Sequence, residues 1–134
     1  MTTARELINS SAKQAGILAN GQVLQSVVSK DALKRLNRMI ARLQNNGVDL
    51  GLSTLVATDT LFIDDADEEA LELQLTLRLM VAYKRPIQPG LSAAAGSAIS
   101  ELQAKYFTIP EMTFDKALTR QHLPHKHALD NLDD

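Results

Sequence analysis

The pattern of hydrophobic and polar residues predicts helices along most of the chain. The first begins at Thr3, because Thr3 and Glu6 have the spacing of a capping box, and ends near Gly16, which can adopt the left-handed conformation that closes a helix. Asn20-Gly21 then marks a turn inside a loop over 19–25. The buried stripe of this first helix is expected to be Ala4, Leu7, Ile8, Ser11, Ala12 and Ala15.

The second helix is predicted to begin near Ser29, and it is the clearest amphipathic segment of the chain. It stops at Asn45-Asn46-Gly47, since asparagine and glycine tolerate the left-handed C-terminal position best. Residues 48–63 are expected to form an extended connection with short strands. The apolar arc of the second helix consists of Leu33, Leu36, Met39, Ile40 and Leu43, and the opposite arc of Lys34, Arg35, Arg38 and Arg42.

Residues 70–83 carry conflicting signals, because leucines alternate with polar residues at the period of a strand. The residue types favour a helix, since the run is rich in Leu, Glu, Gln and Met and poor in β-branched and aromatic residues. The ends of the segment also suit a helix, because acids precede it and the bases Lys84 and Arg85 follow it. Pro86 then stops the helix. We therefore predict a third helix.

Such a helix has two apolar stripes, and only one is needed to face its own core. The second stripe requires another cover, which is either a further contact within a four-helix domain or a subunit interface. One stripe comprises Leu71, Leu75, Leu79 and Ala82, and the other Leu73, Leu77 and Met80.

A fourth helix is predicted from a cap at Ser92 to about Phe107, after a tight connection over 86–90. Small residues over 93–98 would allow its backbone to approach the third helix closely. Its inner face is expected to contain Ala95, Ala98, Ile99, Leu102 and Tyr106. The fold class is therefore all-α, a small four-helix domain over 1–107 with an extended C-terminal tail over 108–134.

Length and composition fit one soluble domain. A chain of 134 residues forms a single core, and the absence of cysteine excludes a disulfide scaffold and a thiol nucleophile. We expect neither a signal peptide nor a membrane-spanning segment. Charge is segregated, with five bases against one acid over 30–42 and seven acids without a base over 59–72. These blocks could meet within one subunit or between identical subunits.

Few residues suggest catalysis or a cofactor. His122, His125 and His127 could share a metal ion, but solvent-facing histidines are the favoured interpretation because a fourth ligand and a rigid frame are lacking. The sequence contains no phosphate-binding loop or nucleophile elbow. The acids over 64–69 suit a solvated helix cap better than a glycosidase cleft. We therefore expect no enzyme activity, cofactor or metal.

Three stretches resemble the phage packaged-DNA stabilisation family, the head-to-tail adaptors of short-tailed phages. The first is Thr3-Ala4-Arg5-Glu6-Leu7-Ile8-Asn9-Ser10 with Ala15-Gly16-Ile17-Leu18-Ala19 and Gly21-Gln22. The second comprises Asp31-Ala32-Leu33 and Leu36-Asn37-Arg38-Met39-Ile40 as far as Gly47, and the third is the leucine-rich and alanine-rich pair of helices over 71–104. Together they cover about three-quarters of the chain.

The resemblance implies a virion protein of the head–tail neck, made in the host cytoplasm. Twelve copies would form a ring beneath the portal protein, retain the packaged DNA and support the next tail protein. The leucines of 71–79 with Met80 would form the core or a subunit interface. The bases Lys34, Arg35, Arg38 and Arg42 would meet either a neighbouring subunit or the packaged DNA in the channel, and the opposing acidic patch would consist of Asp64, Asp65, Asp67, Glu68 and Glu69. The tail would dock on the portal through Phe114, Leu118, Arg120, Leu123 and His125.

Two other functions are kept as alternatives. The first is a cell-wall glycosidase, because lytic activity has been attributed to members of the resembling family. Its acids to test are Glu68, Glu69 and Glu72. A small DNA-binding regulator would instead use the cations that recur on the second helix, Lys34, Arg38 and Arg42.

Overall fold

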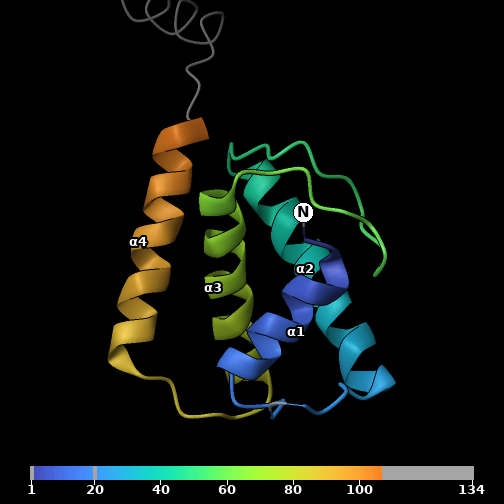
Figure 1. The fold of residues 1–134 in the computed structure, drawn as a ribbon. Helices are drawn as coiled ribbons and strands as arrows, with labels where there is room; N and C mark the ends of the chain where they lie inside the picture. The colour runs from blue at the N-terminus through green and yellow to red at the C-terminus, as the bar shows by residue number, and fades with distance from the viewer. Residues whose placement is uncertain (1, 20, 107–134) are drawn as a thin grey trace, which may run out of the picture.

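The computed structural model describes residues 2–19 and 21–106, which form four helices (Figure 1). They are α1 (Ala4–Gln14), α2 (Ser26–Asn45), α3 (Asp65–Ala82) and α4 (Pro89–Tyr106). The described part contains no strand, and its one β-bridge joins Thr3 to Thr60. The predicted all-α fold of four helices is confirmed, whereas the predicted tail over 108–134 lies outside the described residues.

The start of α1 is fixed by the predicted capping box. The Thr3 hydroxyl accepts the Glu6 N–H at 3.2 Å, and the Glu6 carboxylate accepts the Thr3 N–H at 3.2 Å. The helix ends just before Gly16, whose φ is +80°. The whole predicted stripe is buried. Its one polar member, Ser11, has a hydrogen-bond partner, because its hydroxyl donates to the Glu72 carbonyl of α3 at 3.4 Å.

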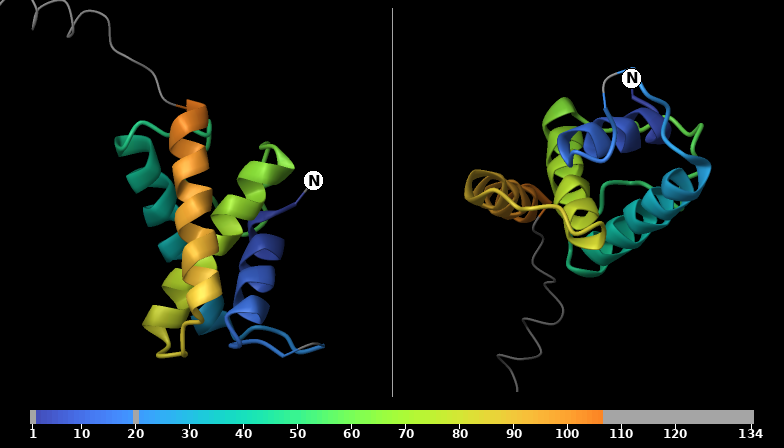
Figure 2. Two further views of the ribbon diagram at one scale, coloured as in Figure 1. Left: turned by 90° about the vertical axis from the view of Figure 1, so that its left-hand side faces the viewer. Right: turned by 90° about the horizontal axis from the view of Figure 1, so that it is seen from below.

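Helix α3 is the centre of the fold, because α1, α2 and α4 all pack against it (Figures 1 and 2). Leu71, Leu75 and Leu79 lie four residues apart on one face of α3, and each is fully buried. A strand would have put all the alternating leucines on one side, whereas the helix distributes them around its axis. The predicted helix over 70–83 is therefore confirmed, and it begins earlier, at Asp65.

Helix α4 packs against α3 and against no other helix of the described part, so it stands outside the trio of α1, α2 and α3 (Figure 2). Ala95 and Leu102 are buried against α3. Helix α4 does approach α3 closely, as predicted, and the Gln74 side chain donates to the Ala95 carbonyl across this contact. Ala93, Ala94 and Ser97 are nevertheless exposed, so only part of the small-residue run faces α3.

Two helices begin three to four residues earlier than predicted. Helix α2 begins at Ser26 rather than Ser29, even though its first turn contains the β-branched Val27 and Val28. Helix α4 begins at Pro89, so Ser92 lies inside the helix instead of capping it. Proline suits the first helical position because its missing N–H would have had no partner there.

The connection between α2 and α3 is extended, as predicted, but the expected short strands do not form in it. Its backbone pairs with the start of α1 instead, through Leu61 N–H to the Thr2 carbonyl and Ala4 N–H to the Asp59 carbonyl, both at 2.9 Å. Asn37 of α2 fixes the middle of the connection. Its side chain donates to the Leu55 carbonyl at 3.0 Å and accepts the Leu55 N–H at 2.8 Å.

Replacing Asn37 with alanine is expected to lower the free energy of unfolding by about 2 kcal/mol, because both backbone groups of the buried Leu55 lose their partner. Urea denaturation followed by circular dichroism measures this loss. Arg38→Ala is the control, since Arg38 is exposed and should change stability by less than about 0.5 kcal/mol. Equal effects of the two substitutions would contradict a structural role for Asn37.

Candidate functional site

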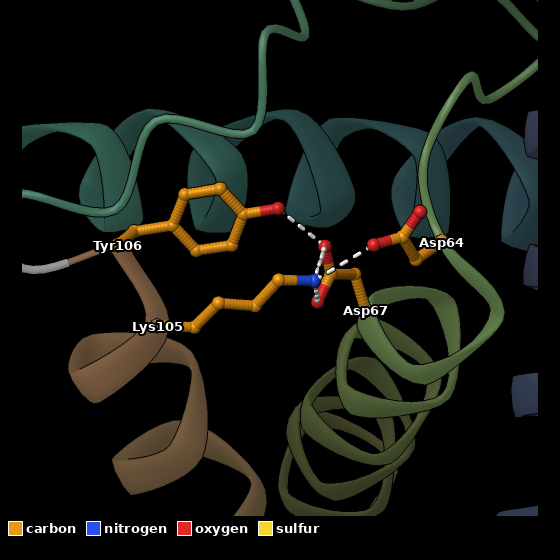
Figure 3. A network of polar contacts seen from close by, with 4 residues as sticks. All are labelled: Asp64, Asp67, Lys105 and Tyr106. Atoms are coloured by element: carbon orange, nitrogen blue, oxygen red, sulfur yellow. Dashed lines mark hydrogen bonds and ion pairs between the residues drawn. The ribbon is translucent and has the colours of Figure 1, made fainter.

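The acidic end of α3 is joined to the last turn of α4 by a polar cluster of four residues (Figure 3). Lys105 of α4 donates to the Asp64 carboxylate at 2.8 Å and to both oxygens of Asp67 at 3.1 Å. The Tyr106 hydroxyl donates to the same Asp67 carboxylate. We call Asp64, Asp67, Lys105 and Tyr106 the α3–α4 clamp, because they fasten the C-terminal end of α4 to the N-terminal end of α3.

The charges in the clamp stabilise one another. The carboxylates of Asp64 and Asp67 raise the pKa of Lys105, and the hydrogen bond and charge of Lys105 lower the pKa of Asp64. Donation to the Asp67 carboxylate raises the pKa of Tyr106, so the phenol stays protonated. Asp67 itself is only 3% exposed, and its hydrogen bonds from Lys105 and Tyr106 compensate for the loss of water around its charge.

The acidic residues therefore separate into two groups. Asp64 and Asp67 both pair with Lys105, but only Asp67 is buried, and its burial corrects the interpretation of the whole run as a solvated cap. Asp65 and Glu69 are exposed and Glu68 is half-buried, and among the described residues none of the three forms an ion pair. These three are the part of the predicted acidic patch that still points outward.

The basic arc of α2 lies apart from those acids. Lys34, Arg38 and Arg42 are exposed, as the amphipathic pattern predicts. Arg35 is half-buried and pairs with Asp31 of its own helix at 2.9 Å. That pairing lowers the pKa of Asp31, which also accepts the Tyr83 hydroxyl at 3.0 Å. Within the described part of the chain, no ion pair links the basic arc to the acidic block.

Arg78 of α3 is a functional candidate that sequence reasoning missed. Its side chain is partly buried, and its Nε atom is buried without a hydrogen-bond partner. Burial lowers the pKa of Arg78, and the nearby charge of Arg42 lowers it further. A cation inside a leucine-rich helix was the available signal, but the alternating pattern could not say which residues would face it.

The two predicted leucine stripes of α3 differ in burial. The stripe of Leu71, Leu75 and Leu79 faces the core. In the second stripe Met80 is also buried, whereas Leu73 and Leu77 are only partly covered. Leu73 lines a hollow beside α4 together with Ala94, Ser97 and Ala98. The domain itself thus covers the first stripe and leaves part of the second accessible.

The residues considered for metal binding and for glycoside hydrolysis lie in different parts of the chain. No group of three metal-ligating side chains occurs there, and the candidate metal ligands His122, His125 and His127 lie outside that range. Glu72 is partly buried beside α1, where burial raises its pKa and the charges of Glu68 and Glu69 raise it further. None of the described helices is both long and apolar enough to cross a bilayer.

The residues predicted to dock on a portal lie outside the described residues as well. They are Phe114, Leu118, Arg120, Leu123 and His125. Comparisons with known proteins find no matching family model and no similar curated protein. The resemblance of residues 3–47 and 71–104 to the phage adaptors therefore stays a prediction from the sequence.

Proposed function

We propose that this protein is a structural, non-catalytic head-to-tail adaptor of a phage virion. Copies of the chain would form a ring of about twelve subunits under the portal protein, retain the packaged DNA and offer an attachment surface to the next tail protein. The site of action would be the neck of the virion. This proposal comes from the sequence resemblance, and the arrangement of the helices is compatible with it.

The observation that carries the proposal furthest is the position of α4. Among the described helices α4 contacts α3 alone, and Leu73 and Leu77 of α3 stay partly accessible. Partly covered leucines beside small exposed residues suit close packing against another protein chain. The acids of α3 and the bases of α2 that form no ion pair within the described ranges would then set the register of such a contact.

Electron microscopy tests the proposal when the full-length chain is mixed with the portal protein encoded in the same genome. We expect an additional ring of density on one end of the portal. The matched variant carries Leu118→Asp and Leu123→Asp, which should abolish the added ring because charged residues replace the predicted apolar docking residues. Portal particles without added density at micromolar concentrations of wild-type chain would refute the proposal.

A further inference from the structure

A shallow groove of about 380 Å³ runs between α2 and the C-terminal half of α3. Its lining residues are Arg35, Gln74, Leu77, Arg78, Val81 and Ala82. Apolar side chains form much of its surface, and Val81 is 63% exposed. We call it the α2–α3 groove. Its mixture of accessible aliphatic and cationic side chains resembles the composition of a protein interface.

The groove has more positive charge than residues 2–19 and 21–106 compensate. Within these residues Arg35 is paired with Asp31, whereas Arg78 has no carboxylate partner and its buried Nε has no acceptor. Arg42 of α2, which forms no ion pair in the same range, adds a second guanidinium close enough to disfavour the charge of Arg78. The Gln74 amide is already occupied, because it donates to the Ala95 carbonyl. A partly buried cation of this kind is stabilised by an incoming anionic group.

The outward acids of the same chain cannot supply that group within one subunit. Glu68 and Arg78 are ten residues apart on one helix, a rise of about 15 Å. Asp65, Glu68 and Glu69 also lie at the end of α3 that the clamp fastens to α4, away from the groove at its other end. In a second copy of the chain the same three acids are not held at this distance, so they can reach the groove of the first copy.

We propose that the α2–α3 groove receives the first turn of α3 from a second copy, so that Asp65, Glu68 and Glu69 meet the guanidinium groups of Arg42 and Arg78. This inference deepens the proposed adaptor function, on which it rests, by naming the two surfaces that join neighbouring subunits. The surfaces are different, so the contact is head-to-tail, and repetition of such a contact closes a ring when the rotation allows it. The aliphatic floor of the groove favours a protein segment over a nucleic-acid backbone.

Sedimentation velocity of the full-length chain at low salt, about 50 mM, tests the contact directly. We expect the wild-type protein to self-associate at low salt. High salt should weaken this association at least about tenfold. Arg42→Glu and Glu69→Lys should each weaken association by about tenfold or more, because each places like charges across the contact. An equimolar mixture of the two variants, or a chain carrying both substitutions, should restore it because the opposite charges meet again.

Two further variants separate this contact from folding and from general charge effects. Arg78→Met keeps the aliphatic stem and removes the buried cation, so it should weaken association while the circular dichroism spectrum stays native. Lys13→Glu is the matched control, since Lys13 is an exposed base on α1 and should leave association unchanged.

Several results would overturn the inference. They are a wild-type chain that stays monomeric up to about 500 µM at low salt, association unaffected by Arg42→Glu and Glu69→Lys, and no restoration in the mixture. Loss of duplex DNA binding in Arg42→Glu with unchanged self-association would assign the cations to nucleic acid and also overturn it. Portal binding is measured separately, so a ring on the portal that survives these substitutions refutes the groove contact without refuting the adaptor.

Discussion

Replacing Leu75 with alanine is expected to lower the free energy of unfolding by about 3 to 5 kcal/mol. Leu75 is fully buried in the middle of α3, the helix on which the three others pack. Truncation removes three buried carbon atoms and leaves a cavity that rigid helices cannot fill completely. Urea denaturation followed by circular dichroism measures the change, and the expected loss is a large part of the total stability of a small domain.

Leu77→Ala is the matched control for this substitution. Leu77 lies on the same helix two residues further along, but it is only partly covered and lines the α2–α3 groove. We expect it to cost less than about 1.5 kcal/mol of stability and to weaken self-association instead. If the two substitutions lower the free energy of unfolding equally, the assignment of Leu75 to the core and Leu77 to the surface would be wrong.

The second large effect is expected from Asp67→Ala, which should lower the free energy of unfolding by about 2 to 3 kcal/mol. The substitution removes a buried carboxylate that accepts from both Lys105 and Tyr106, and hydrogen bonds to charged groups are among the stronger ones. Because α3 is the one described helix that contacts α4, the loss of stability should be concentrated in α4. Amide hydrogen exchange should show reduced protection in α4, with α1 and α2 little changed.

Asp65→Ala is the control for the clamp, since Asp65 is an exposed acid in the same turn and forms no ion pair among the described residues. It should cost less than about 1 kcal/mol, mainly through the lost interaction with the helix dipole. Tyr106→Phe removes one donor and should give an intermediate loss. Unchanged exchange of α4 in Asp67→Ala would show that the apolar contacts alone hold the helix.

Much of the fold could be predicted from the sequence because local signals agreed with the tertiary packing. Thr3 and Glu6 specify the start of α1 through contacts three residues apart, which no distant residue needs to complete. In α3, residue propensity outweighed the alternating leucines, since a helix with three neighbours can bury leucines on several faces. The strand period was therefore a consequence of wide burial rather than of a pleated backbone.

The start of α4 and the surfaces were harder to predict, because they depend on where the helices lie in space. Ser92 is a good capping residue, but Pro89 already provides a favourable first turn. The burial of Asp67 depends on Lys105 and Tyr106, nearly forty residues further along the chain. The orphan Nε of Arg78 likewise results from packing between two helices, so no local pattern around Arg78 could have indicated it.

The clamp also determines how the domain responds to mechanical load. Helices α3 and α4 are antiparallel, with Lys105 beside Asp67 and Ala95 beside Gln74. A force that pulls residue 106 away from α3 therefore acts first on the clamp, because neither α1 nor α2 contacts α4. Once the clamp opens, α4 would peel from its last turn towards Pro89 while the trio of α1, α2 and α3 keeps its core. The order in which the domain yields under tension is thus built into its architecture.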